Sequence, residues 1–343
     1  MNPFHDLSLI GHEDEIAFLQ RTVTDDRPAH AYLFTGAEGI GKKLVAIKLA
    51  CMLNCPEPAA DKDSSCRVCR RIVAENHPDF VIERPQRGII RIERIRGLQN
   101  FFRYAPVEGR YRVIIIDDAH LMNRSAQNAL LKTLEEPPQG RILVLVSAKP
   151  FLLLSTVRSR CRRVRFGPLP IGPLAELLEK RRGVVRQKAQ VLAAMSCGSV
   201  SRAIDMETSN FLDLRELIIS TLADPGRSGL GGLLEVSAAI STDRKTAMEA
   251  IEIAATWVRD LLMERVLGDT SSLIHRDLLD RISSEAQHHS SERLLSAYEE
   301  LAEASRLIEA DINVNRNIVT DVMLLKIARI LAGPSFGLAR STA

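Results

Sequence analysis

Residues 36–43 combine glycines and lysines in an order that can hold a phosphate group. The segment reads GAEGIGKK, and its key positions are Gly36, Gly39, Gly41, Lys42 and Lys43. It matches the pattern G-x-x-x-x-G-K, in which backbone N–H groups and a helix N-terminus hold phosphates while the lysine reaches the terminal ones. A strand-like run precedes it and a helix-like run follows. The loop therefore predicts a nucleotide phosphate site; the alternative is a glycine-rich turn without a ligand.

The loop departs from this pattern at its last position. Magnesium coordination calls for Ser or Thr after the lysine, and Lys43, whose ammonium cannot ligate a cation, stands there instead. Asp117 and Asp118 follow the apolar run 112–116, where an α/β nucleotide-binding protein places the groups that handle Mg²⁺ and water. The second acid is Asp, whose side chain is about one methylene shorter than that of Glu. Its carboxylate therefore falls short of the position from which it could polarise the attacking water. We expect ATP or ADP with Mg²⁺ to bind weakly or not at all, and hydrolysis to be lost.

An arginine, Arg160, follows the apolar run 142–146 and a short helix expected at residues 152–156. We expect the apolar run to carry the chain to an edge of the sheet, so that Arg160 projects away from its own phosphate loop. A planar guanidinium suits a charge delivered to a phosphate, in this chain or in a neighbouring subunit. The alternative is a solvated basic loop, because other arginines stand close by: Arg158, Arg162, Arg163 and Arg165.

The cysteines suggest a metal site. Four of the six fall within residues 51–69: Cys51, Cys55, Cys66 and Cys69. The last two form a C-x-x-C pair, which can hold two corners of a Zn²⁺ tetrahedron that upstream cysteines complete. Cys51 has an alternative role as a core thiol, because it lies at helical spacing from Cys55 in the apolar run LACML. Cys161 and Cys197 are interpreted as small buried residues.

The composition is that of an ordinary globular protein, with 45% hydrophobic and 26% charged residues among 343, enough for two or three domains. A net charge of +3 is too small to indicate a nucleic-acid binder by itself. No apolar run approaches the roughly 20 residues of a membrane span, and the N-terminus has acids where a signal peptide has basic and apolar regions. We expect a cytoplasmic protein with no membrane partner, whose cysteines are thiols or metal ligands.

Strand-like and helix-like runs must position these residues, and they alternate up to about residue 167. Strands are expected at residues 31–35, 80–83, 112–116, 142–146 and 163–166, and helices at residues 13–23 and 42–53. A further helix is expected to stop at Pro137-Pro138. This alternation, with near-continuous apolar strands, predicts an α/β fold with a parallel sheet covered on both faces.

The segment 167–173 ends the alternation, with three prolines and two glycines in seven residues. It cannot continue a central strand or a helix, so we expect a domain boundary there. The rest of the chain predicts helices: short ones over residues 174–207, then longer ones at residues 211–222, 247–267, 291–312 and 316–331. Residues 334–343 are expected to form a disordered tail.

Several long segments resemble the clamp-loader subunits of bacterial DNA polymerase III. They are IGHEDEIAFL, HAYLFTGAEGIGKK, IIRIERIRGL and the block from AQNALLKTLEEPP through STVRSRC, and the similarity covers nearly all of residues 7–170. The resemblance implies an AAA+ P-loop-type module at residues 1–167 with a small cysteine (zinc) insertion at about residues 51–77. It further implies a small helical lid at residues 168–208 and an all-α collar, used for oligomerisation, at residues 209–333.

Proteins of this family work in a ring of five subunits that uses ATP to open the sliding clamp and place it on primed DNA. The resemblance therefore implies gamma/tau motors, delta, the clamp and primed DNA as partners. Lys43 and Asp118 favour the delta-prime branch, whose members typically act as non-hydrolysing stators. A gamma/tau-type motor is the first alternative, although it needs a complete phosphate loop. A standalone AAA+ DNA-repair ATPase is the second, and the intact AQNALLKTLEEPP block with a helical collar disfavours it.

The resemblance also implies roles for single residues. Ser-Arg-Cys is similar to the family's trans-acting arginine-finger motif, which implies that Arg160 serves a neighbour's ATP site. Arg202, in GSVSRA, matches the lid sensor of the motor, with a plain salt bridge as its alternative. The family's zinc module runs Cys-x8-Cys-x2-Cys-x2-Cys, and Asp63 stands where its second cysteine is expected. The implied zinc ligands are Cys55, Cys66 and Cys69, with Asp63 or Cys51 as the fourth.

Overall fold

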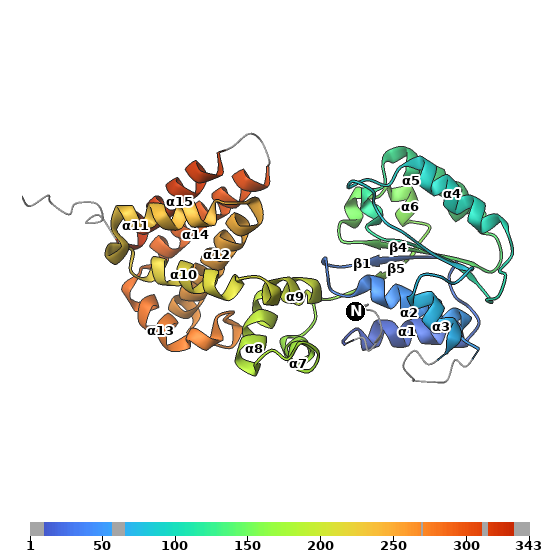
Figure 1. Ribbon diagram of the computed structural model, residues 1–343, viewed down its shortest axis with the longest axis horizontal. Coiled ribbons are helices and arrows are strands. Elements are labelled where there is room, and N and C mark those ends of the chain that lie inside the picture. Colours follow the sequence, from blue (N-terminus) through green and yellow to red (C-terminus); the bar gives the residue numbers. More distant parts are fainter. Residues whose placement is uncertain (1–9, 57–65, 269, 311–314, 333–343) are drawn as a thin grey trace, which may run out of the picture. The chain divides into compact units, whose positions relative to one another are not determined.

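The computed structural model describes residues 10–56, 66–268, 270–310 and 315–332 (Figure 1). The chain divides into two compact units: residues 1–182 with 197–202, and residues 183–196 with 203–343. The first unit is a sheet between helices and the second consists of helices, which confirms the predicted α/β fold followed by an all-α region. The exact domain boundaries proposed from the sequence stay predictions. No helix within the described ranges is long and apolar enough to cross a lipid bilayer.

The sheet of the first unit has five parallel strands in the order β2-β3-β4-β1-β5. Their bounds are β1 (Ala31–Thr35), β2 (Phe80–Glu83), β3 (Arg112–Ile116), β4 (Arg141–Ser147) and β5 (Arg162–Arg165). The chain that leaves β4 leads to β5 at an edge of the sheet, as expected for residues 142–146, although β4 itself is the central strand. The order of parallel strands depends on the crossover connections, which a local apolar pattern does not encode.

Helices cover both faces of this sheet (Figure 1). One face carries α1 (Glu13–Thr24), α2 (Lys42–Asn54) and α3 (Arg67–Val73); the other carries α4 (Ile92–Arg103), α5 (Arg124–Glu135) and α6 (Ser155–Arg158). Alternate side chains of β1 enter opposite cores: Tyr32 and Phe34 lie in one, Ala31 and Leu33 in the other. Two short 3-10 turns, η1 (Ala119–Leu121) and η2 (Pro150–Leu152), follow β3 and β4. Apart from polar residues at their ends, β1 to β4 are therefore continuously apolar, whereas β5 at one edge (RRVR) is not.

The proline-rich segment 167–173 contains the start of a helix. Helix α7 (Ile171–Arg182) begins inside it, with Pro173 in the first turn, where a helix tolerates proline. Just before it, the N–H of Leu169 donates to the carbonyl oxygen of Gly198 at 3.2 Å. This bond holds the segment 197–202, and with it the first turn of α9 (Val200–Thr208), in the first unit.

In the second unit, α12 packs against α10, α13 and α14, and its Trp257 is fully buried. The helices are α8 (Arg186–Met195), the rest of α9, α10 (Phe211–Ala223), α11 (Pro225–Ile240), α12 (Arg244–Leu267), α13 (Leu279–His288), α14 (Ser291–Glu309) and α15 (Arg316–Ala332), with turns η3 (Thr270–Ser272) and η4 (Arg276–Leu278). A buried arginine, Arg215, ties α10 to Asp277 at 2.7 and 3.0 Å and to the Nδ1 of His275 at 3.0 Å. This polar network fixes the chain between α12 and α13.

Candidate functional site

The phosphate loop lies at the carboxyl end of β1, between Thr35 and the first residue of α2. Its shape requires glycine. At Gly36 (φ +153°) an added Cβ would collide with the carbonyl oxygen of Phe166, and at Gly39 (φ +73°) with the hydroxyl of Ser199. Gly41 caps the N-terminus of α2 in a left-handed conformation. The loop thus presents a helix N-terminus, the arrangement that binds anions.

Lys42, the lysine of the G-x-x-x-x-G-K pattern, turns back onto this loop. Its Nζ donates to the carbonyl oxygen of Gly36 at 2.9 Å and to that of Ala37. Burial lowers the pKa of Lys42, although nearby carboxylates, Asp118 and Asp117 first among them, act in the opposite direction. The ammonium is therefore held at the loop by oxygen atoms that a phosphate oxygen can replace.

Lys43 contacts the acid at the end of β3. Its Nζ lies 2.9 Å from the Oδ2 of Asp117, and the side chains are 33% and 13% exposed. The backbone of Asp117 is fixed, because its N–H donates to the carbonyl oxygen of Glu83 at 2.9 Å. Mg²⁺ does not fit this arrangement, since the residue that should offer a hydroxyl ligand brings a positive charge and occupies the carboxylate.

Asp118 stands beside this pair in a left-handed backbone conformation with φ 47°. Burial, and then the neighbouring Asp117 carboxylate, raise the pKa of Asp118. The segment 197–202 lies on the other side of the loop, where the N–H of Ser201 donates to the carbonyl oxygen of Gly39 at 3.3 Å. Arg202 follows on the first turn of α9, and its N–H donates to the Oγ of Ser199 at 3.3 Å. The structure thus brings together the predicted loop, both acids and the segment that carries Arg202.

Arg160 lies at the opposite end of the sheet. It comes two residues before the start of β5, and β5 runs parallel to β1, whose carboxyl end leads into the phosphate loop. A five-residue strand spans about 16 Å, so Arg160 does not face its own loop. Its guanidinium contacts the Oε1 of Glu135 on α5 at 2.8 Å and donates to the carbonyl oxygen of Thr156 at 3.0 Å. Both charged side chains are accessible, 37% and 50% exposed.

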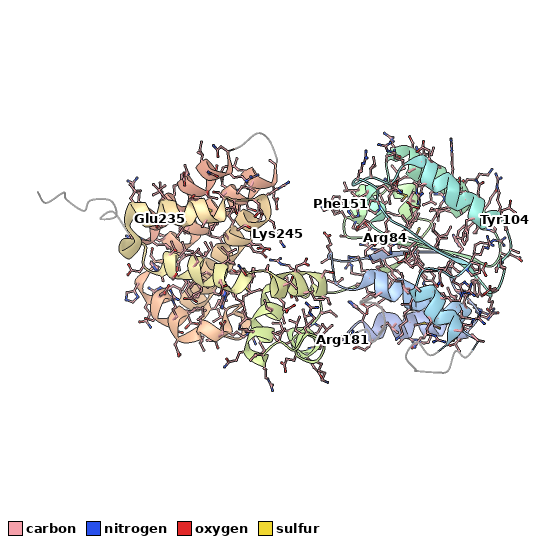
Figure 2. All side chains as sticks on the ribbon, viewed as in Figure 1. Arg84, Tyr104, Phe151, Arg181, Glu235 and Lys245 are labelled. Carbon is pink, nitrogen blue, oxygen red and sulfur yellow. The ribbon has the colours of Figure 1, made fainter. Side chains whose placement is uncertain are left out.

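The surroundings of Arg160 differ in part from the prediction. The expected helix at residues 152–156 is instead the turn η2 followed by α6, with Leu153 buried between them. Two large apolar side chains of η2, Phe151 and Leu152, are 70% and 50% exposed (Figure 2 labels Phe151). Of the neighbouring arginines, Arg162 stacks on Phe18 at 4.7 Å and so is not simply solvated.

Sequence reasoning missed a buried glutamine that positions this segment. Gln127 of α5 is 4% exposed; its Nε2 donates to the carbonyl oxygen of Met122 at 2.9 Å, and its Oε1 accepts the N–H of Leu154 at 2.7 Å. It therefore joins the start of α5 to the chain that leads into α6. The sequence did hold a sign of this role, because Gln127 is a polar residue on the same otherwise apolar helix face as Leu130.

The cysteines meet at the junction of α2 and α3. The sulfur atoms of Cys55, Cys66 and Cys69 all lie within 4.8 Å of one another. A tetrahedral zinc site with Zn–S bonds of about 2.3 Å needs sulfurs about 3.8 Å apart, so this donor set fits Zn²⁺. Cys51 is buried, and its thiol donates a weak hydrogen bond to the carbonyl oxygen of Cys69 at 4.0 Å. The other candidate ligand, Asp63, lies outside the described residues.

The remaining two cysteines are less buried than predicted. Cys161 is half-buried, and burial raises its pKa to about 12. Cys197 is exposed, with a left-handed backbone (φ 51°), so its prediction as a buried residue is wrong. It belongs to the connection between α8 and α9, and a tight turn there directs the side chain outward. Neither cysteine offers a ligand to the α2–α3 cluster.

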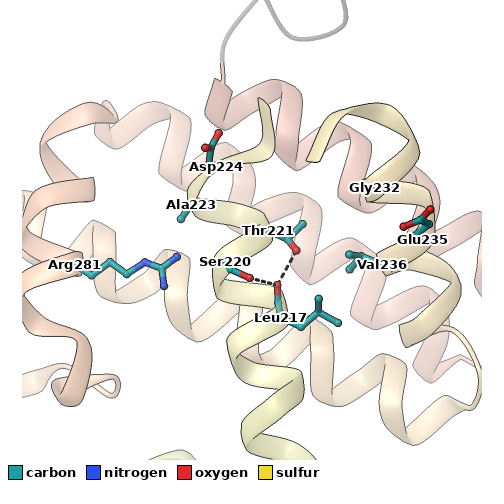
Figure 3. A pocket seen from close by; sticks show the side chains of 9 residues that line it. All are labelled: Leu217, Ser220, Thr221, Ala223, Asp224, Gly232, Glu235, Val236 and Arg281. Atoms are coloured by element: carbon teal, nitrogen blue, oxygen red, sulfur yellow. Dashed lines mark hydrogen bonds between the residues drawn. The ribbon is translucent and has the colours of Figure 1, made fainter. Parts of the chain in front are cut away.

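The helical unit holds a pocket of about 590 Å³ among α10, α11 and α13 (Figure 3). Several of its polar side chains are engaged in hydrogen bonds or ion pairs. The hydroxyls of Ser220 and Thr221 donate to the carbonyl oxygen of Leu217 at 3.0 and 2.7 Å, and Arg281 bonds Glu285 at 2.9 Å.

Comparison with known proteins agrees with the phosphate-loop fold. Residues 11–170 match the family described as DNA polymerase III, delta subunit, and residues 209–329 match DNA polymerase III, delta subunit, C terminal. DNA polymerase III subunit delta' of Bacillus subtilis is 29% identical over 90% of this chain and 94% of its own length. Subunit tau of Salmonella typhimurium is 30% identical over 81% of this chain, but only 44% of tau is covered.

One solved structure supports the fold alone. A DNA polymerase III gamma subunit-related protein from Thermotoga maritima superposes with a TM-score of 0.52 at 20% identity, over 93% of this chain and all of that one. The parallel sheet with its phosphate loop is thus the AAA+ architecture predicted from the sequence. Both family matches and the near full-length similarity to delta' agree on one assignment. The chain belongs to the DNA polymerase III delta' family of clamp-loader subunits.

Proposed function

We propose that the protein is a non-hydrolysing subunit of a replicative clamp loader, the assembly that uses ATP in neighbouring subunits to open the sliding clamp and load it on primed DNA. The observation that carries this proposal is the pair between Lys43 and Asp117 at 2.9 Å. It puts a positive charge where the hydroxyl ligand of Mg²⁺ would stand and pairs that charge with the first acid, which disfavours the metal that phosphoryl transfer needs. A gamma/tau-type motor is less well supported, because the similarity to tau covers under half of that protein.

In this proposal each domain has its own role. Residues 1–167 form the AAA+ module, residues 168–208 the lid, and residues 209–333 the collar that binds the gamma/tau and delta subunits. The clamp and primed DNA are reached through the assembled complex. The degenerate loop makes ATP turnover depend on those motors, so this subunit contributes structure and one guanidinium.

Arg160 is that guanidinium, acting in trans. Its position at the amino end of the strands, away from its own loop, favours a phosphate on a neighbouring subunit. The exposed Phe151 and Leu152 on η2 provide apolar surface for that neighbour to cover. The ion pair with Glu135 is exposed, and exposed pairs contribute at most about 1 kcal/mol, so the guanidinium can exchange Glu135 for a phosphate.

Cys55, Cys66 and Cys69 hold one Zn²⁺ in this proposal, with Cys51 or Asp63 as the fourth ligand. Bound as a closed tetrahedral site, the ion supplies a structural crosslink and no reactive position. It ties the C-terminal end of α2, the helix that begins at the phosphate loop, to the short α3.

Reconstitution with wild-type motor and delta subunits tests the function. The full chain should co-purify in a complex whose mass includes the other subunits, and Arg160→Ala should assemble equally well. In the complex with Arg160→Ala, single-turnover ATP hydrolysis at the neighbouring site should fall by about 10³-fold, as for arginine fingers in general. Clamp loading should be slower as well. Arg158→Ala, at the exposed last residue of α6, is the matched control and should change neither rate. Unchanged rates with Arg160→Ala, or failure to join the complex, would contradict the proposal.

A further inference from the structure

We propose that the ammonium of Lys43 permanently takes the place of the divalent cation at the phosphate loop, so that phosphates bind here without metal. This inference rests on the proposed function, because it assumes that the loop is a nucleotide site that has lost hydrolysis rather than an unrelated turn. It names the ligand class, a di- or triphosphate free of Mg²⁺. Related sites that hydrolyse ATP take the same anion with its metal.

Geometry places the ammonium where the metal would act. Lys43 follows the phosphate-binding lysine directly, the position whose hydroxyl ordinarily ligates Mg²⁺. Its Nζ reaches the first acid after β3, at 2.9 Å from Asp117. The main chain of Asp117 is held in place, because its N–H extends the β2–β3 ladder to Glu83. A positive charge is therefore already paired with the first acid.

The charges at the loop explain why phosphates would still bind while a divalent cation is excluded. Asp117 is already neutralised by Lys43, and a divalent cation placed beside the ammonium would be repelled by it. The incoming phosphates still meet two lysines and the N-terminus of α2. Lys42 can exchange the carbonyl oxygens of Gly36 and Ala37 for phosphate oxygens, while Lys43 keeps its carboxylate.

An ammonium replaces the charge of the metal but not its chemistry. It is a point charge with three donors, and it has no coordination sites at which to align a water molecule or both transferring oxygens. The same substitution thus accounts for retained affinity and lost turnover. If the pair between Lys43 and Asp117 instead closed the loop against anions, no phosphate would bind at all.

Equilibrium binding of ADP and of inorganic pyrophosphate to the isolated full chain tests this. We expect saturable binding whose Kd changes by less than about twofold between Mg²⁺ and EDTA. Lys43→Thr restores a hydroxyl and frees Asp117, so its Kd should become about tenfold or more tighter with Mg²⁺ than with EDTA. That variant should also bind Mn²⁺ in the presence of ADP, seen directly by electron paramagnetic resonance. Lys48→Thr, on the same helix, is the control and should behave like the wild type.

Two results would overturn the inference: no binding of either probe by the wild type, or wild-type binding that Mg²⁺ tightens by about tenfold. A Lys43→Thr variant that stays independent of metal would do the same. These outcomes are distinct from failure of the proposed function, which concerns complex assembly and the effect of Arg160→Ala. Mg²⁺-tightened binding together with ATP turnover by the lone wild type would overturn both.

Discussion

A single carboxylate, Asp79, organises the loop that leads into β3. It is fully buried and accepts the N–H groups of Val107, Glu108 and Gly109, each at 2.8 Å. The Nε of Arg112 adds a bond at 3.1 Å. Burial alone would raise the pKa of Asp79, but the backbone donors and Arg112 outweigh burial, so its pKa lies below the ordinary value.

Asp79→Asn should lower the free energy of unfolding by about 3 kcal/mol or more, because it leaves the buried Arg112 without its counter-charge. A carboxyl with a depressed folded pKa stabilises the fold above its unfolded pKa of about 3.9, and this stability is lost as the pH falls through the folded pKa. Urea unfolding should therefore show a large difference at pH 7 that shrinks below about pH 4. Asp26→Asn, in the exposed pair with Arg110, is the control and should cost under about 1 kcal/mol. If both variants lost the same free energy of unfolding, burial of the pair between Asp79 and Arg112 would not be what makes it stabilising.

At the scale of elements, the junction of α2 and α3 depends on its cysteines. Cys55 caps the end of α2 and Cys66 precedes α3, so one ion would hold both helix ends. The seven-residue α3 is too short to be stable by itself. Its packing onto α2, with Ile72 fully buried, needs the two ends to stay together.

The double variant Cys66→Ser, Cys69→Ser should lose about one equivalent of zinc and melt at a lower temperature, because structural zinc contributes directly to folding free energy. Elemental analysis and thermal unfolding of the purified protein give both values. Cys197→Ser, at the exposed cysteine, should change neither. A double variant that keeps its metal content and its melting temperature would rule out this site.

At the scale of the whole molecule, the phosphate loop and the arginine proposed to act in trans are separated. The phosphate loop lies at the carboxyl ends of the strands and Arg160 at their amino ends, so the guanidinium of Arg160 does not reach the loop of its own chain. An exposed guanidinium beside exposed apolar side chains suits a contact with another subunit. Activity is therefore expected of the complex and not of this chain.

The isolated protein should show negligible ATP hydrolysis, because Lys43 occupies the metal's carboxylate and no guanidinium reaches the loop in trans. Steady-state phosphate release with Mg²⁺ should stay far below the ~1 s⁻¹ low end of ordinary enzymes. The wild-type motor subunits, assayed alike, are the positive control. Turnover near ~1 s⁻¹ by the lone chain would favour the motor interpretation.

The sequence by itself determined the elements and the class of the site. Strands β1, β2 and β3 begin and end where predicted, because each is an apolar run bounded by polar or turn-forming residues. The pattern of residues 36–43 identified the phosphate loop, since its glycines are a local requirement of the backbone. The C-x-x-C pair likewise located the cysteine cluster, because its spacing is fixed within one turn of helix.

Only the tertiary structure decided which of these residues meet. Lys43 and Asp117 are 74 positions apart, and their contact depends on β3 and the start of α2 sharing one end of the sheet. The central place of β4, and so the position of Arg160 before an edge strand, follows from crossover connections that no local pattern records. The ion pair of Arg160 with Glu135 and the outward turn at Cys197 depend likewise on packing. Local physics sets the elements, whereas contacts between distant segments are set by the arrangement that buries the most apolar surface.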